Sequence, residues 1–291
     1  MTISPTIKKN YLQKLAEQNK RSDGRKFNDY RPVSIEPGVI SKAEGSARVK
    51  IGNTQVVAGI KMVMGEPYPD TPDAGVMTTA AELIPLASPD FEAGPPRENA
   101  IELARVVDRG IRESNVIELE KLCLEPGEKI WVVFIDIHII DYDGNLFDAA
   151  SLAALAALYG ARMPIDRLEE EDRKAYIKKL EDFGIKPVEE TVKNKAGDEE
   201  KVMSYYIPMR EPPISCTFVK FNDAVVVDPS LDEEEIAEAR LTVATDSNGS
   251  IRAMQKGLNG SFTLEEIKKI IKDSLITGEA LRKQLNESAG R

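Results

Sequence analysis

Residues 129–161 read KIWVVFIDIHIIDYDGNLFDAASLAALAALYGA, and this stretch decides the fold class. Residues 129–140 are rich in β-branched and aromatic side chains and predict a long strand. The DYDGN segment at 141–145 is a strong turn signal. Residues 148–161 are apolar on nearly every side, which is typical of a helix buried in the middle of a protein. A strand that leads into a buried helix indicates a mixed α and β protein.

The segments before this stretch predict more strands and one amphipathic helix. Residues 47–51 and 55–60 flank a Gly-Asn turn and predict a hairpin. Residues 76–86 have the pattern of another strand. Residues 98–114 carry apolar side chains at helical spacing.

The segments after it repeat the same layout of strands followed by a helix. Strands are predicted at 213–221, 224–227, 241–245 and 251–255. A final helix begins at Thr263, because Thr263 and Glu266 have the spacing of a capping box, and it runs to about Leu285. We therefore predict an α+β protein built from two tandem units.

Composition predicts the domain boundaries. Residues 166–200 carry 20 charged side chains in 35, which predicts a solvated connector or insertion that is helical at most in part. The predicted organisation is an N-terminal helix at 1–20, a first half at 21–165, a charged connector at 166–204, and a second half with the C-terminal helix at 205–291.

The two cysteines and the single histidine exclude several classes of protein. Cys123 and Cys216 are far apart, which favours a reducing, cytoplasmic setting without disulfides. Together with His138 they cannot form a structural zinc site, so we expect no bound metal. We expect no signal peptide, and no membrane partner, since no apolar stretch approaches the roughly 20 residues needed to span a bilayer.

Known catalytic motifs are absent from the sequence. There is no P-loop, no dinucleotide-binding GxGxxG and no HExxH. A Ser-His-Asp triad could use only His138, which lies inside the predicted strand 129–140, so a structural role is favoured for it.

Three arginines lie on one side of the predicted helix 98–114. Arg105, Arg109 and Arg112 are spaced at i, i+4 and i+7. They could grip phosphate groups, because guanidinium groups match phosphate oxygens in pairs. They could instead form local ion pairs on a solvated face, and on the residues alone this second interpretation is favoured. The neighbouring acids that could pair with them are Glu98, Glu102 and Asp108.

A group of carboxylates follows the predicted strand 224–227. Its members are Asp228, Asp232, Glu233, Glu234 and Glu235. Carboxylates at the end of a strand can act as a general acid or hold Mg²⁺. The residues alone favour an acidic helix start with Ser230 as its cap.

Several blocks together resemble the RNase PH family. RSDGR at 21–25 with Arg31 is similar to the family's entry signature, and 45–58 to its first hairpin. The blocks at 67–75, 91–114 and 228–235 resemble one branch, the archaeal exosome subunit that pairs with the catalytic RNase PH-like subunit. The resemblance covers roughly residues 20–285.

The departures from the family pattern concern catalysis. Catalytic members carry Asp-Gly-Gly-Ser/Thr-Arg before the buried helix, where these residues hold inorganic phosphate. This chain instead has Asn145, Leu146 and Phe147 after Asp143-Gly144. Of the family's pair of aspartates, Asp228 matches the first and Glu234 stands at the second. The resemblance therefore implies no complete phosphorolytic site, no catalytic residue and no cofactor.

The resemblance also implies a fold and an assembly. The fold would be two ribosomal-S5-like βαβ units in an RNase PH-like arrangement. Three heterodimers with the catalytic subunit would form a hexameric ring, with RNA-binding cap subunits on one face and single-stranded RNA threading the centre. Arg105, Arg109 and Arg112 would then hold the RNA backbone, while the role of nearby Arg97 stays open. Such a local arginine stripe would reconcile RNA binding with a formal net charge of -10.

Two other functions remain open at this point. One is an active homo-hexameric phosphorolytic exoribonuclease of the RNase PH type, which would have to rebuild its phosphate site without help from Leu146 and Phe147. The other is a binding module with no role in RNA contact.

Overall fold

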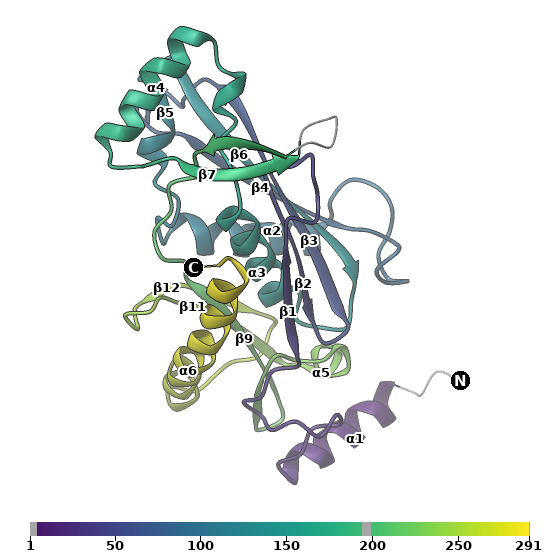
Figure 1. Ribbon diagram of the computed structural model, residues 1–291. Helices are drawn as coiled ribbons and strands as arrows, with labels where there is room; N and C mark the ends of the chain where they lie inside the picture. Colours follow the sequence, from purple (N-terminus) through teal and green to yellow (C-terminus); the bar gives the residue numbers. More distant parts are fainter. Residues whose placement is uncertain (1–4, 194–198, 291) are drawn as a thin grey trace.

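A computed structural model describes residues 5–193 and 199–290 of the chain. These residues form two large β-sheets and a small hairpin sheet, with helices packed on both large sheets (Figure 1). The predicted α+β class is confirmed. Residues 1–4 of the predicted N-terminal helix, 194–198 of the charged connector and Arg291 lie outside the described residues.

The first half forms a sheet with the strand order β1-β2-β3-β6-β4, and a short strand β5 also pairs with β6. The strands are β1 (Val33–Pro37), β2 (Gly45–Ile51), β3 (Thr54–Gly65), β4 (Val76–Leu83), β5 (Cys123–Glu125) and β6 (Lys129–Asp141). Strand β4 runs parallel to β6, and helix α2 (Glu98–Arg112) lies between them in the chain, which makes a βαβ unit. The other strand pairs of this sheet are antiparallel.

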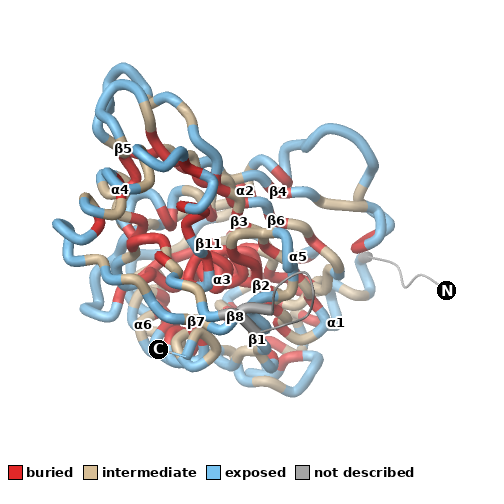
Figure 2. The backbone as a smooth tube through the Cα atoms, turned by 45° about the horizontal axis from the view of Figure 1, so that its top comes forward, coloured by how far each residue is buried: buried red, intermediate tan, exposed pale blue. Residues whose placement is uncertain are grey.

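Helix α3 (Leu146–Tyr159) lies between the two large sheets. It contacts β2 and β3 on one side and β9 on the other, so it is buried from one end to the other (Figure 2). This explains why its sequence is apolar all round. Small residues bring it close to the first sheet, since a Cβ added to Gly45 would lie 2.3 Å from the carbonyl oxygen of Ala157.

The second half forms an antiparallel sheet with the order β10-β9-β11-β12. The strands are β9 (Ile214–Phe221), β10 (Ala224–Val227), β11 (Ala239–Thr245) and β12 (Ile251–Gly257), and helix α5 (Leu231–Ile236) follows β10. Helix α6 (Leu264–Ser288) packs on β9 and β11. The predicted capping box is confirmed, because Thr263 N donates to Glu266 Oε2 (2.6 Å) and Glu266 N to Thr263 Oγ1 (3.2 Å). Helix α1 (Pro5–Glu17) contacts α5.

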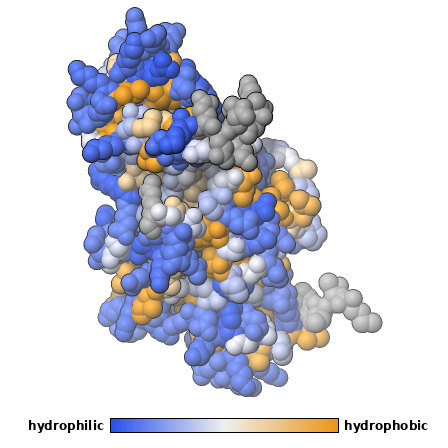
Figure 3. All heavy atoms as spheres, in the orientation of Figure 1, coloured by the Kyte–Doolittle hydropathy of each residue, from blue (hydrophilic) through white to orange (hydrophobic). Residues whose placement is uncertain are grey.

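The charged segment between the halves is more regular than its composition predicts. One short 3-10 turn and three longer elements lie in this region: η2 (Ile165–Arg167), α4 (Glu170–Asp182), β7 (Val188–Lys193) and β8 (Glu199–Ser204). A second 3-10 turn, η1 (Leu119–Leu122), precedes β5 in the first half. Tyr176 and Leu180 of α4 are buried, and the Tyr176 hydroxyl donates to the carbonyl of Lys121 (2.8 Å). On the face shown in Figure 3, mostly hydrophilic residues cover this part of the molecule (top), with a patch of apolar residues among them. Two large anchoring side chains are too weak a signal to stand out among so many charges.

Candidate functional site

The turn before α3 meets the second half of the chain at close range. Gly144 has φ +88°, and a Cβ there would lie 2.5 Å from the carbonyl oxygen of Pro229, so only glycine fits. The Thr54 hydroxyl donates to the Gly144 carbonyl (2.6 Å) and ties the turn to β3. Asn145, next in the chain, has φ 57°, a left-handed conformation that asparagine tolerates.

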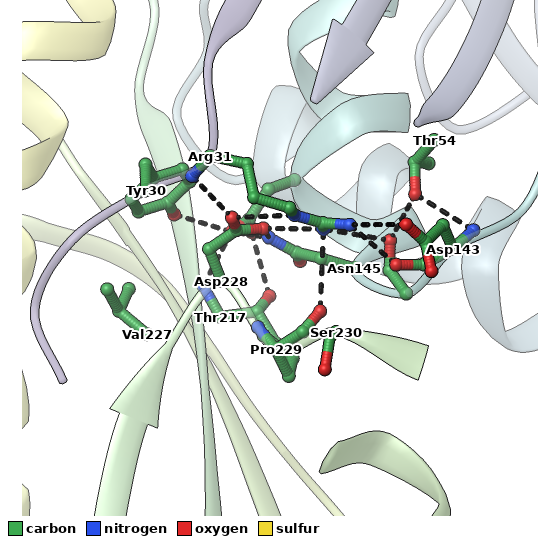
Figure 4. A network of polar contacts seen from close by, with 12 residues as sticks. Tyr30, Arg31, Thr54, Asp143, Asn145, Thr217, Val227, Asp228, Pro229 and Ser230 are labelled. Atoms are coloured by element: carbon green, nitrogen blue, oxygen red, sulfur yellow. Dashed lines mark hydrogen bonds and ion pairs between the residues drawn. The ribbon is translucent and has the colours of Figure 1, made fainter. Parts of the chain in front are cut away.

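Asp228 lies fully buried at this junction of the two halves (Figure 4). Arg31 donates from Nη2 to Oδ1 (2.8 Å) and from Nε to Oδ2 (2.9 Å), and Arg25 donates from Nη1 to Oδ2 (2.8 Å). Asn145 Nδ2 donates to Oδ1 (2.7 Å). Burial opposes the charged form, but the hydrogen bonds and positive charge of Arg31 bring the pKa of Asp228 below its usual range. Both carboxylate oxygens are therefore already engaged within the chain.

A second buried ion pair joins the same segments. Arg21 donates from Nε and Nη2 to the two oxygens of Glu233 (2.9 and 2.6 Å). Its remaining nitrogen, Nη1, donates to the carbonyl of Val227 (2.9 Å). The arginines at 21, 25 and 31, which the sequence marked only as a family signature, thus hold the N-terminal segment against the second half. We call these three arginines with Asp228 and Glu233 the junction cluster.

Glu234 faces the turn from helix α5. Its Oε1 accepts from the backbone N–H of Asn145 (2.9 Å), and its Oε2 accepts from the Tyr142 hydroxyl (2.7 Å). Burial raises the pKa of Glu234, while these hydrogen bonds act in the opposite direction. Burial and the nearby Glu234 charge raise the pKa of Tyr142. Glu234 thus connects the second half to the turn.

Asp148, in the first turn of α3, is a buried acid that the sequence analysis did not single out. It accepts hydrogen bonds from the Tyr30 hydroxyl (2.6 Å), the Thr217 hydroxyl (2.7 Å) and amide (2.9 Å), and Asn145 Nδ2 (2.8 Å). Burial raises its pKa to about 6 despite these donors. An acid in the first turn of an otherwise apolar helix was the available signal.

Leu146 and Phe147 line a hollow of about 340 Å³ between α2, α3 and α5. We call it the α3 pocket, and its other lining residues include Phe91, Glu102, Tyr142, Glu234 and Arg240. The Arg240 guanidinium lies 4.1 Å from the centre of the Phe147 ring and forms an ion pair with Glu102. The positions where the resemblance implies a hydroxyl and a guanidinium therefore contribute an apolar wall.

The three arginines of α2 differ in how far they are engaged. Arg105 is exposed and has no hydrogen-bond or ionic partner within the described part of the chain. Arg109 Nη1 donates to the neutral Gln255 of β12 (2.6 Å). Arg112 is held by Asp108, with Nε and Nη2 donating to its carboxylate (2.9 and 2.8 Å), and these bonds raise the pKa of Arg112. We call Arg105 and Arg109 the α2 stripe.

Three further predicted residues lie away from these features. Arg97, just before α2, is 72% exposed in its side chain and pairs with Glu92. His138 is half-exposed on β6, with Nδ1 3.5 Å from a Glu82 oxygen. Among residues 5–193 and 199–290, no three His, Cys, Asp or Glu side chains are grouped as a metal site would require. No helix in those ranges is long and apolar enough to cross a membrane.

Comparison with known families agrees with this two-part layout. Residues 29–164 match domain 1 of the 3′ exoribonuclease family of RNase PH, and residues 211–275 match its domain 2. The chain belongs to the RNase PH family. The matched domains correspond to the two large sheets, and the α3 pocket of this RNase PH-family chain lies between them.

Individual relatives share nearly the whole chain. The exosome complex component Rrp42 of Methanocella arvoryzae is 49% identical over 279 residues, which cover 96% of this chain and 95% of that protein. Rrp42 of Thermoplasma acidophilum is 47% identical over 97% of this chain and 96% of its own. Among solved structures, a chain of the Archaeoglobus fulgidus exosome with RNA bound to the active site is 44% identical, with a TM-score of 0.81 and coverage of 97% and 99%. An archaeal exosome core chain is 40% identical, with a TM-score of 0.77 and coverage of 97% of both chains.

Proposed function

We propose that this chain is a non-catalytic ring subunit of an archaeal exosome, a complex that degrades RNA from the 3′ end with phosphate as nucleophile. The observation that carries the proposal is the chemistry of the α3 pocket. Cationic and hydroxyl side chains are strong donors to inorganic phosphate, whereas Leu146 and Phe147 present neither and Arg240 is paired with Glu102. Asp228 has both oxygens bound by arginines and Asn145. A phosphorolytic site in this chain would therefore lack its main phosphate ligands.

The chain contributes to RNA binding, in this proposal, through the α2 stripe. Arg105 is free of partners among the described residues, and Arg109 is bound only to a neutral side chain. Both guanidinium groups can replace bound water by hydrogen bonds to the oxygens of a phosphodiester backbone. Arg112 contributes less, since Asp108 already neutralises it.

The proposed assembly is a hexameric ring of three heterodimers with a catalytic RNase PH-like subunit, capped on one face by RNA-binding subunits. The relatives named as exosome complex components and the similarity to an archaeal exosome core support it. A cytoplasmic location agrees with the two unpaired, buried cysteines.

The test is a reconstitution with the catalytic partner. The chain, the partner and their mixture are each incubated with labelled single-stranded RNA and inorganic phosphate, and the release of nucleoside diphosphates is measured. We expect no release from the chain alone and far more from the mixture than from the partner alone. Release by the chain alone would overturn the proposal in favour of a homo-hexameric phosphorolytic exoribonuclease.

A further inference from the structure

The lining of the α3 pocket is acidic. Four carboxylates border it: Asp90, Glu102, Glu234 and Glu235. The single cation of the lining, Arg240, is occupied by Glu102 and by the Phe147 ring. Glu235 pairs with Lys8 outside the lining, which leaves Asp90 and Glu234 without an ion pair among the described residues. The lining therefore keeps a net negative charge, and the pocket disfavours anionic groups.

The same pocket offers flat aromatic walls. The rings of Phe91 and Tyr142 stack on each other with centres 5.3 Å apart and an interplanar angle of 22°. Its volume of about 340 Å³ lies within the range of roughly 300–1,000 Å³ that is usual for small-molecule sites. A planar heteroaromatic ring can stack on an outer face of this pair, as every nucleobase can.

The polar groups of the lining select for hydrogen-bond donors. Ionised carboxylates accept hydrogen bonds and donate none. Oε1 of Glu102 accepts from Arg240, but its Oε2 has no donor in the described part of the chain, and the Glu102 side chain is 39% exposed. A guanine base presents two neighbouring donors, N1–H and the 2-amino group, on one edge, whereas adenine, cytosine and uracil each place an acceptor beside their donor.

We propose that the α3 pocket binds a guanine base of RNA, with stacking on its aromatic walls and hydrogen bonds to Glu102. This inference rests on the proposed function, since it names a part of the same RNA. Helix α2 links the two features: Glu102 lines the pocket and Arg105 belongs to the α2 stripe, three residues and about 4.5 Å further along the helix axis. A nucleotide whose phosphate contacts Arg105 can therefore place its base in the pocket. The α3 pocket, which lacks side chains that bind phosphate, thus binds a base in this chain.

The first experiment is calorimetry of the full-length chain with guanosine, guanosine 5′-monophosphate, adenosine, cytidine, uridine and spermidine. We expect guanosine to bind, the other nucleosides to bind at least about tenfold more weakly, and the monophosphate to bind more weakly than guanosine. The inference is overturned if no nucleoside binds, if the monophosphate binds best, or if spermidine binds and guanosine does not.

Paired variants locate the binding. Glu102→Gln should weaken guanosine binding about tenfold or more, because a charged acceptor is lost. Glu98→Gln makes the same change one turn earlier on α2, outside the pocket, and should leave guanosine binding unaltered. Equal effects of the two variants would refute the assignment to the pocket.

Introducing a positive charge tests the sign of the pocket's electrostatic potential independently. Leu146→Arg places a cation in the lining and should reverse the preference, so that guanosine 5′-monophosphate binds better than guanosine. An unchanged preference would count against the inference. Its failure differs from failure of the proposed function: if changes in the α2 stripe weaken RNA binding while guanosine does not bind, only the pocket inference falls.

Discussion

The arginines of the junction cluster and those of the α2 stripe have the same side chain and opposite surroundings. Arg21 and Arg31 are buried and bound to Glu233 and Asp228, whose carboxylates are themselves buried. Arg105 is exposed, and no carboxylate within the described ranges pairs with it. Whether an arginine can bind phosphate is thus decided by the carboxylates that the fold brings to it. In the junction cluster, those carboxylates come from distant parts of the chain.

The two groups should also differ in what their loss costs. Removing one partner of a buried ion pair leaves a charge without compensation in a medium of low polarity, which costs several kcal/mol. Removing an exposed charge changes the free energy of unfolding very little. We therefore expect the junction cluster to contribute to stability and propose that the α2 stripe contributes to binding. The following predictions test this division and the buried acids beside it.

The largest effect is expected at the junction cluster. Asp228→Ala should lower the free energy of unfolding by about 3–5 kcal/mol, because the buried Arg31 guanidinium loses its buried carboxylate partner and Arg25 keeps only Asp23. Urea unfolding measures this. Asp232→Ala removes an aspartate at the start of α5 that is 48% exposed and paired with Lys8, and it should cost less than about 1 kcal/mol. Similar losses for the two variants would contradict the division.

The next effect is a pH dependence that arises at Asp148. Burial raises its pKa to about 6, whereas an unfolded aspartate titrates near 3.9. The folded state holds the proton more tightly, so this group lowers the free energy of unfolding as the pH rises from about 4 to 6, by on the order of 3 kcal/mol. Asp148→Asn cannot titrate and should lose this decrease, as urea unfolding between pH 4 and 7 would reveal.

Asp228, at the same junction, has the opposite effect on how stability changes with pH. Because its pKa is lowered in the folded state, it adds stability above its unfolded pKa, and that stability is lost as the pH falls through the folded pKa. The two acids therefore act in different pH windows. The difference in free energy of unfolding between the original chain and Asp148→Asn should therefore change between pH 4 and 6. A constant difference would contradict the burial of Asp148.

Local signals in the sequence predicted much of the fold. The capping box at Thr263 and Glu266 involves residues three apart, and the turn before α3 depends on Gly144 and its neighbours. The all-round apolar pattern of α3 correctly indicated a buried helix, although the helix begins at Leu146, two residues before the predicted start. Such features can be predicted from a single sequence because the residues that signal them are close together in the chain.

The contacts that make the candidate site could not be read in this way. Arg21 and Glu233 are 212 positions apart, and nothing in the local pattern pairs them. Of the acids near the arginines of α2, Asp108 pairs with Arg112 at the i+4 spacing, whereas Glu102 pairs with Arg240 of β11. The sequence identifies the arginines, but which of them are free to bind phosphate depends on the strands that pack against α2.

A smaller effect, confined to binding, is expected for the α2 stripe. The double variant Arg105→Glu and Arg109→Glu should weaken RNA binding by the assembled complex roughly ten- to a hundredfold at low salt. The dependence of log K on log salt should become shallower by about 1.4, the contribution of two cations on a single strand. Lys269→Glu with Lys272→Glu makes the same charge change on the exposed face of α6 and serves as the control. Equal losses for the two double variants would assign the effect to net charge alone.

The smallest effect separates arginines that are neighbours on one helix. Arg112→Gln should change RNA binding less than about twofold, because the guanidinium that it removes already neutralises Asp108, while Arg105→Gln should weaken binding several-fold. Asp108→Asn removes the competing carboxylate, so it should strengthen RNA binding and make a further Arg112→Gln change costly. If Arg112→Gln is as harmful as Arg105→Gln in the original chain, the ion pair with Asp108 does not hold Arg112 back from RNA. Exposure of the whole arginine face, rather than the pairing of each side chain, would then decide which arginines bind.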